Sequence, residues 1–330
     1  MIAPSAPTRP WIGLLLAAAI TALSFLIKGL QVPLIASLSP LMLAVLIGMA
    51  LRNTLGRPES ARSGLALAVR APLRLGIVLL GLQVTLAEIL HIGAGGLALL
   101  LFALVATFVV TRWLGRRLGV SDGLASLIAA GTSVCGASAI VAANTVVGED
   151  DEAVAYALAT VTLFGTVAMF LYPLIGALLP LGDPAYGLWI GASVHEVAQV
   201  VAAGFAHGQT SGEAATVAKL GRVLLLAPLV IFMARSRAAG ERQARVPIPW
   251  FVFGFIALVL VASTGWLDPA LRSTAALVTQ VLLAFALAAV GLETDFKRLL
   301  AQGWRPLALG ALATLFIGAS TLVLALLWQW

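Results

Sequence analysis

Long, uninterrupted hydrophobic stretches follow one another from Trp11 to Trp330. Each has about twenty residues, enough for a helix to cross the roughly 30 Å hydrocarbon core of a bilayer. They are rich in alanine and leucine and do not alternate with period two, which favours helices over a β-barrel. The pattern predicts an all-α, polytopic membrane protein of about eleven transmembrane helices, in one transmembrane domain over 1–330. The predicted spans are 11–28, 34–51, 72–90, 95–112, 122–147, 153–179, 186–206, 214–234, 249–265, 274–292 and 305–328.

The composition agrees with this fold and indicates an orientation. Hydrophobic residues make up 61% of the chain and charged residues 10%, and the net charge is +6. The basic residues lie in short loops between spans, where they report topology and not a nucleic-acid partner. If every span crosses, sixteen of these residues share one side and two, Lys28 and Arg272, lie on the other. The N-terminus is then cytoplasmic and the C-terminus outside, with the acidic run 149–152 on the outer side.

The first stretch, 11–28, has a long apolar region and no clear cleavage site after it. We therefore expect a retained helix and not a signal peptide. Such an apolar helix can pack against a partner subunit, so a homodimer is one expected assembly.

An internal repeat is visible at an offset of 210 residues. The segment GLQVTLAEILHIGAGGLAL, from Gly81, aligns without gaps on GLETDFKRLLAQGWRPLAL, from Gly291. The copies are seven spans apart, and an odd separation means that they run in opposite directions through the membrane. This predicts inverted repeats, with halves of roughly 11–147 and 186–328, as in many secondary transporters. A chance match in an alanine- and leucine-rich chain is the alternative.

Two predicted spans are interrupted by small or polar residues. The first reads DGLASLIAAGTSVCGASAIVAANTVVG from Asp122. Unpaired backbone groups at a helix break are costly in lipid unless they face protein or a hydrated cavity, so a break here indicates a site. The second half-helix would direct its N–H groups toward an anion. A close-packing face of small residues is the alternative. The candidate residues are Thr132, Ser133, Cys135, Gly136 and Ser138.

The second interrupted span, GLWIGASVHEVAQVVAAGFAHG, carries His195, Glu196 and Gln199 inside an apolar stretch. Ionisable groups in a membrane usually line a pathway or pair with one another. With His195 and Gln199 four residues apart on one helix face and Glu196 beside them, the pattern predicts a site for proton exchange. A structural hydrogen-bonding cluster is the alternative.

The next span contains Lys219 and Arg222, three residues apart on one face. We expect each to pair with Glu196 or to bind an anionic substrate directly. Snorkelling of the two side chains to the membrane surface is the competing interpretation.

The motifs GTSVCGASAI, WIGASVHEVAQVVAAG and KLGRV resemble the YeiH family, described as sulfate exporters of the bacterial inner membrane, over essentially the whole chain. The resemblance implies a panel and a core, with two interrupted helices that cross near the membrane midplane. It also implies that the site is lined by ten residues: Thr132, Ser133, Cys135, Gly136, Ser138, His195, Glu196, Gln199, Lys219 and Arg222. The chain ends where the 210-residue offset would place a second copy of the first interrupted helix, so the repeat is imperfect or permuted.

These features lead to a main hypothesis and two alternatives. The main one is a secondary transporter of a small anion, such as sulfate or a sulfonate, coupled to H⁺ or Na⁺ and without a cofactor. A cation/proton antiporter that uses Glu196 is the nearest alternative. An intramembrane protease is the remote one, because HExxQ at 195–199, with His207 further on, differs by one residue from the HExxH zinc motif.

Overall fold

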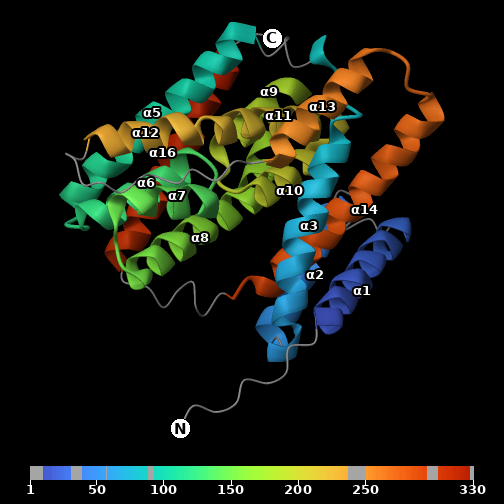
Figure 1. The fold of residues 1–330 in the computed structure, drawn as a ribbon, viewed down its shortest axis with the longest axis horizontal. Helices are drawn as coiled ribbons and strands as arrows, with labels where there is room; N and C mark the ends of the chain where they lie inside the picture. The colour runs from blue at the N-terminus through green and yellow to red at the C-terminus, as the bar shows by residue number, and fades with distance from the viewer. Residues whose placement is uncertain are drawn as a thin grey trace. The chain divides into compact units, whose positions relative to one another are not determined.

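The computed structural model describes residues 10–30, 39–56, 58–87, 93–236, 250–295 and 304–327. Over these residues it is almost entirely helical and contains no strand, which confirms an all-α polytopic membrane protein (Figure 1). Seven of the described helical segments are long and apolar enough to cross a bilayer. The helices are α1 (Pro10–Gly29), α2 (Pro40–Thr54), α3 (Arg62–Leu80), α5 (Gly93–Arg117), α6 (Asp122–Ser133), α7 (Ala137–Val147), α8 (Asp151–Gly176), α9 (Asp183–Ser193), α10 (Val197–His207), α11 (Gln209–Leu224), α12 (Leu226–Ser236), α13 (Trp250–Ser263), α14 (Pro269–Glu293) and α16 (Trp304–Leu327), with a 3₁₀ turn at Glu59–Ala61.

Ten of the eleven predicted spans coincide over most of their described length with one helix or with two consecutive helices. The predicted span 72–90 overlaps α3 only over 72–80, because α3 begins at Arg62 and includes Arg70, which the prediction placed in a loop. The predicted span 214–234 is divided into α11 and α12 at Leu225. Pro228 accounts for this division, because proline has no N–H to donate to the carbonyl four residues earlier.

The chain forms two compact units, Met1–Glu88 with Trp250–Phe296 and Ile89–Pro249 with Lys297–Trp330. In the first unit, α14 packs against α2 and α3. Gly48 and Gly291 allow the backbones of α2 and α14 to approach, since a Cβ at either position would overlap backbone atoms of the other helix. All ten predicted site residues belong to the second unit.

Helix starts follow the 210-residue offset to within one residue, because α2 and α13 begin at 40 and 250 and α5 and α16 begin at 93 and 304. The division into repeat halves at 11–147 and 186–328 stays a prediction.

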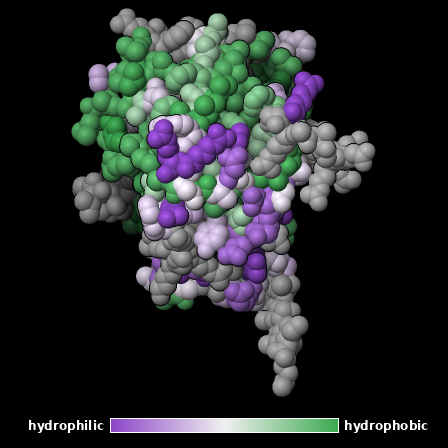
Figure 2. Space-filling model, turned by 90° about the vertical axis from the view of Figure 1, so that its left-hand side faces the viewer, coloured by the Kyte–Doolittle hydropathy of each residue, from purple (hydrophilic) through white to green (hydrophobic). Residues whose placement is uncertain are grey.

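The second unit presents an apolar outer surface. Helix α5 exposes Leu97, Leu101, Val105 and Val109, a stripe with one residue per turn, while Ala103 and Thr107 on its other side are buried. In the view of Figure 2, hydrophobic residues cover the upper part of the surface, and hydrophilic residues are gathered in the middle and lower parts. This separation is typical of a surface that faces lipid in one part and water in another.

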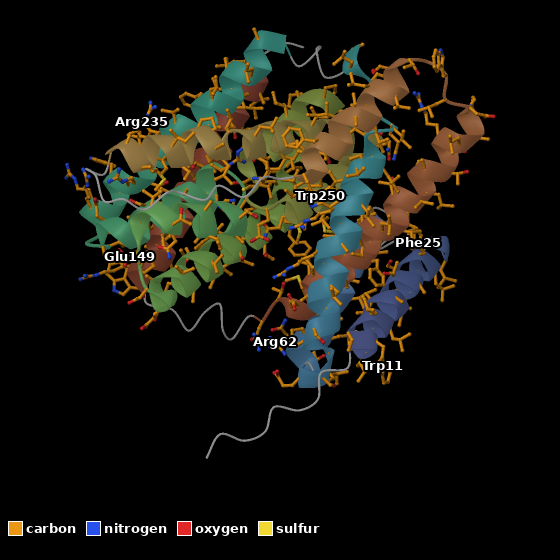
Figure 3. All side chains as sticks on the ribbon, in the orientation of Figure 1. Trp11, Phe25, Arg62, Glu149, Arg235 and Trp250 are labelled. Atoms are coloured by element: carbon orange, nitrogen blue, oxygen red, sulfur yellow. The ribbon has the colours of Figure 1, made fainter. Side chains whose placement is uncertain are left out.

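Helices α6 and α7 form a hairpin, which we call hairpin 1. The interruption lies at 134–136, as the sequence predicted, but the chain reverses there. Gly136 has a φ of +70°, a conformation suited to glycine. A Cβ at Gly123, near the start of α6, would overlap the carboxylate of Glu149, just beyond the end of α7 (Figure 3). In a continuous helix these two residues would be about 39 Å apart.

Helices α9 and α10 form a second hairpin, hairpin 2, with its turn at 194–196. The Tyr186 hydroxyl, in the first turn of α9, donates to the Ala203 carbonyl of α10 over 3.0 Å. The Tyr186 ring also stacks on His207, the last residue of α10, with centroids 4.2 Å apart. The start of α9 and the end of α10 therefore lie side by side.

The structure therefore differs from the prediction of two interrupted helices that cross the membrane. Each hairpin returns toward the end from which it started, so two of the eleven predicted spans do not cross. The two changes cancel, so the spans after hairpin 2 keep the direction that the sequence predicted.

The acidic run 149–152 changes side and joins the end of the second unit where Arg112 and Arg116 pair with Asp122, each over 3.1 Å. Its predicted outer position was wrong because the hydropathy of α6 and α7 does not reveal a reversal between them.

The hairpin geometry is testable by cross-linking. In a Cys135→Ala background, which removes the single native cysteine, Gly123→Cys combined with Glu149→Cys is expected to form an intramolecular disulfide under mild oxidation. The control pair, Gly123→Cys with Asp183→Cys, places one cysteine at the base of each hairpin and is expected to stay reduced. Peptide mass spectrometry identifies the bond. Full maleimide labelling of both cysteines in the first pair after oxidation would contradict the hairpin.

Candidate functional site

The turns of the two hairpins meet in the second unit. We call residues 134–136 tip 1 and residues 194–196 tip 2. A Cβ at Gly136 would lie 2.5 Å from the Glu196 Cγ, so the two tips are in van der Waals contact. Helix α8 links the base of one hairpin to the base of the other, and its 26 residues span about 39 Å, enough to cross a bilayer. Thr162, near the middle of α8, contacts tip 2, so the tips meet about halfway along this helix.

Lys219 of α11 bridges the tips. Its ammonium group donates to the Val134 carbonyl over 2.6 Å and to the Val194 carbonyl over 2.9 Å. These residues are the C-caps of α6 and α9, the first helices of the two hairpins. The side chain is fully buried.

Arg222, one turn further along α11, holds the same two helix ends. Its Nε donates to Ser133 O over 3.2 Å and its Nη2 to Thr132 O over 2.7 Å, both at the end of α6. Its Nη1 donates to the Gly191 and Val194 carbonyls of the second hairpin, over 3.1 and 3.2 Å.

Both cations are fully buried, so the snorkelling interpretation is wrong. The last carbonyls of a helix lack intrahelical donors and carry partial negative charge. Lys219 and Arg222 satisfy these carbonyls in both hairpins and balance their charge.

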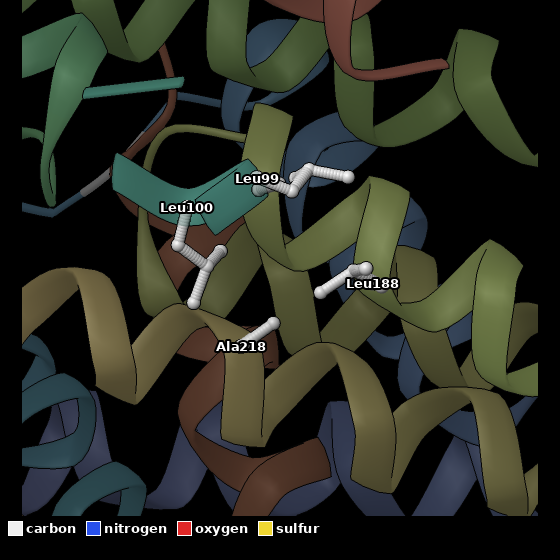
Figure 4. Packing of buried hydrophobic residues seen from close by; sticks show 5 residues of the cluster. Leu99, Leu100, Leu188 and Ala218 are labelled. Atoms are coloured by element: carbon white, nitrogen blue, oxygen red, sulfur yellow. The ribbon is translucent and has the colours of Figure 1, made fainter. Parts of the chain in front are cut away.

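Close packing between α9 and α11 brings the two cations to the tips. A Cβ at Gly191 would overlap the backbone of Ala215, so the helices can approach only with glycine here. Leu188, on α9, and Ala218, on α11, belong to an apolar cluster with Leu99 and Leu100 of α5 (Figure 4). This cluster excludes water from one side of the site.

Tip 2 is closed by its own side chains. Glu196 caps α10, because its carboxylate accepts from the Gln199 N–H and its own N–H donates to the Gln199 Oε1. The carboxylate also accepts from the Thr162 hydroxyl over 2.8 Å. Unlike the two cations, Glu196 is only half-buried.

Gln199 also fixes hairpin 2 to α8. Its amide donates to the Thr162 carbonyl and to the Thr166 hydroxyl, each over 3.2 Å. Gly165 makes room, since a Cβ there would overlap the amide. Sequence reasoning missed both threonines, although two hydroxyls one turn apart beside a glycine were a usable signal.

His195 is directed toward α16. Its Nε2 lies 3.0 Å from the Thr314 hydroxyl, while no partner within the described residues meets hydrogen-bond criteria at its Nδ1. His195 precedes α10, so the expected helix face shared by His195 and Gln199 does not exist. Because Glu196 is directed toward α8, the predicted exchange of a proton between these neighbours gains no support from the geometry. Thr314 was also missed.

Tip 1, by contrast, is open. Gly136 is the N-cap of α7 and has no side chain to cap it. Among the described residues, the N–H groups of Ala137 and Ser138 have no acceptor. Ser138 is exposed, while Cys135 is a buried free thiol and the buried Thr132 hydroxyl has no partner in the described part of the chain. The structure thus brings nine of the ten predicted residues together in and behind the tips, and places Ser138 at their exposed edge.

This geometry defines the class of the protein. It is a polytopic α-helical membrane protein in which a buried Lys–Arg pair holds two hairpins tip to tip. The family model described as "Conserved hypothetical protein 698" matches residues 12–310. The chain is 38% identical over 324 residues to the UPF0324 inner membrane protein YeiH of Salmonella typhimurium, covering 94% of this chain and 92% of that protein. It is 37% identical to YeiH of Escherichia coli K12, with the same coverage. A UPF0324 membrane protein of Listeria monocytogenes is 34% identical over 325 residues, covering 97% and 96%.

The chain belongs to the UPF0324 family, which includes the YeiH proteins, and the resemblance inferred from its motifs is confirmed.

Proposed function

We propose that this protein is a secondary transporter of a small anion, such as sulfate or a sulfonate, and not an enzyme. It works by alternating access, is coupled to H⁺ or Na⁺, and requires no cofactor. The observation that carries the proposal is the open N-terminus of α7 at tip 1. Two unpaired N–H groups and an exposed hydroxyl at a helix N-terminus are suited to binding an oxyanion.

The charges around the tips support an anionic substrate. Lys219 and Arg222 lie directly behind them, whereas Glu196 is the one carboxylate that contacts them among the described residues. Two of the three Lys219 donors and four of the five Arg222 donors are used for the helix ends, so the two cations act on a substrate mainly through their field. This refines the expectation that they bind the anion themselves.

Glu196 provides a physical link between proton and anion. Its half-buried carboxylate lies against Gly136, the N-cap of α7. An anion at this N-terminus is repelled by the ionised carboxylate and accepted beside the protonated one. We therefore assign the coupling proton to Glu196 if H⁺ is the driving ion.

Membrane placement follows from the same proposal. Relatives carry the name inner membrane protein, and we place this chain in the bacterial inner membrane, with its N-terminus in the cytoplasm and its C-terminus outside. Sixteen basic residues on the cytoplasmic side support this orientation. A homodimer is part of the proposal.

The geometry gives less support to the alternatives. His195 and His207 lie at opposite ends of α10, whereas zinc ligands must converge on one ion. Glu196 is used as a helix cap and does not face either histidine. A cation/proton antiporter needs several free acidic ligands at the tips. In the described residues, Glu196 is the one carboxylate that contacts the tips.

A mimic of the bound anion tests the proposal. Ser138→Asp places a carboxylate at the open end of α7, and is expected to stabilise the protein by about 0.3–1 kcal/mol without ligand. It should also abolish stabilisation by sulfate, because the site is already filled. Thermal unfolding of purified protein in a sulfate titration measures both effects.

Ser138→Asn is the matched control, since it has a similar shape without charge and should retain the response to sulfate. If wild type, Ser138→Asp and Ser138→Asn respond identically to sulfate, the anion site is not at α7. Proteoliposomes with no sulfate flux under a proton or sodium gradient would count against the transporter itself.

A further inference from the structure

The position of the Lys219 ammonium has a consequence for the coupling ion. It lies between two carbonyl oxygens that end equivalent helices, Val134 O of α6 and Val194 O of α9, at 2.6 and 2.9 Å. Each carbonyl is at the negative end of its helix. Both oxygens are buried with the ammonium, at a point where the two hairpins meet.

Opposed helix C-termini of this kind are suited to a cation. In secondary transporters built from discontinuous helices, unwound carbonyls and the C-terminal ends of half-helices coordinate the coupling Na⁺. Here the equivalent carbonyls already have a cationic partner, and this partner is covalently attached to α11. A free sodium ion cannot occupy the same point while Lys219 remains.

We propose that the Lys219 ammonium is a built-in substitute for a coupling sodium ion, so that the protein cycles without Na⁺. This inference rests on the proposed transport function. Of the two coupling ions proposed there, H⁺ and Na⁺, it selects H⁺. The ammonium joins hairpin 1 to hairpin 2 throughout the cycle, as a bound cation would, and Glu196 carries the ion that is exchanged.

Arg222 has a different role. Its planar guanidinium divides its donors among four carbonyls from the two helix ends, as expected of a fork and not of a point charge. The cation position is therefore specific to Lys219, and deleting that side chain should create a vacant site that a small organic cation can fill.

Chemical rescue tests this inference. Lys219→Ala removes three methylene groups and the ammonium, a fragment of the size of n-propylammonium. The variant is expected to lose about 5 °C or more of melting temperature, because the buried Val134 carbonyl loses its donor and the Val194 carbonyl keeps only the donor from Arg222. n-Propylammonium should restore at least about half of this loss, and methylammonium less, while the wild type should respond to neither amine nor to Na⁺.

Lys219→Met is the matched control, since it fills the space without charge and leaves no room for the amine. Restoration by n-propylammonium in Lys219→Ala but not in Lys219→Met supports the cation site. Equal responses of the two variants to the amine, or no response in Lys219→Ala, would overturn it. If Lys219→Ala does not fold, Lys219→Ser expressed with the amine present provides the same comparison.

Sulfate flux separates this inference from the transport proposal. Wild-type proteoliposomes are expected to take up sulfate equally well with and without Na⁺ under a proton gradient. Flux that requires Na⁺ would disprove the substitute role and leave the transporter intact. Absence of sulfate flux together with rescue by n-propylammonium would disprove sulfate transport and leave the cation site intact.

Discussion

Arg222→Ala is expected to destabilise the protein more than any other single substitution in the second unit. Arg222 donates to Thr132, Ser133, Gly191 and Val194 carbonyls and is fully buried. Its removal takes this donor from the Thr132, Ser133 and Gly191 oxygens where water does not reach, while Val194 O keeps the Lys219 ammonium. Each unsatisfied oxygen costs about 1–3 kcal/mol. A total loss of about 4 kcal/mol or more is expected, consistent with the effect of removing one partner from a buried charged network. Thermal unfolding in detergent, or the yield of monodisperse protein, measures this loss.

Two further variants make the interpretation specific. Arg222→Lys keeps the charge but cannot divide its donors among both helix ends, so it should recover only part of the stability. Arg235→Ala removes an exposed arginine in the last turn of α12 (Figure 3) and should change stability by less than about 0.5 kcal/mol. A loss for Arg222→Ala as small as that for Arg235→Ala would show that the helix ends do not depend on the guanidinium.

The membrane fold and the positions of the interruptions could be predicted because hydropathy and polarity are local properties. Twenty apolar residues predict a helix wherever they occur. Gly131, Thr132, Ser133, Cys135 and Gly136 stand together where lipid would penalise an exposed backbone. The turn of hairpin 1 lies among these residues.

The reversal of the chain at each turn could not be read in the same way. A hydrophobic helix of 12 residues followed by one of 11, as in α6 and α7, has the same hydropathy whether the second continues or returns. The decision depends on tertiary contacts such as Gly123 with Glu149 and Tyr186 with Ala203. The spacing of hydrophobic residues along a helix carries no information about these contacts.

The polar residues around the tips show the same limit. Lys219 and Arg222 were correctly predicted as buried, but their partners are backbone carbonyls, which have no signature in side-chain sequence. Thr162 and Thr314 were missed because a single threonine in a transmembrane helix most often bonds its own helix, as the Thr314 hydroxyl also does with Gly310 O. What marks them as part of the site is their contact with Glu196 and His195.

Glu196→Gln is expected to have the largest effect on transport, with little effect on the fold. Glutamine has nearly the same shape, and its carbonyl oxygen can still accept from the Thr162 hydroxyl as the carboxylate does. It cannot ionise, so it resembles permanently protonated Glu196. Wild-type affinity for sulfate should rise as the pH falls, because protonation removes a negative charge next to Gly136. In Glu196→Gln the affinity should be independent of pH between about 5 and 8, because the glutamine side chain does not ionise.

Removal of the Glu196 charge is expected to change both the affinity for sulfate and the sulfate flux. At the upper end of that range the variant should bind sulfate about tenfold more tightly than wild type, equivalent to roughly 1.4 kcal/mol of repulsion removed. Sulfate accumulation driven by a proton gradient should nevertheless fall at least about tenfold, because no proton is exchanged at the tips, while sulfate exchange without a gradient persists. Glu152→Gln, which removes an exposed carboxylate near the start of α8, serves as the control and should retain wild-type behaviour in both assays. Proton-driven accumulation that survives in Glu196→Gln would place the coupling proton on another group and would leave Glu196 with a role in capping α10 alone.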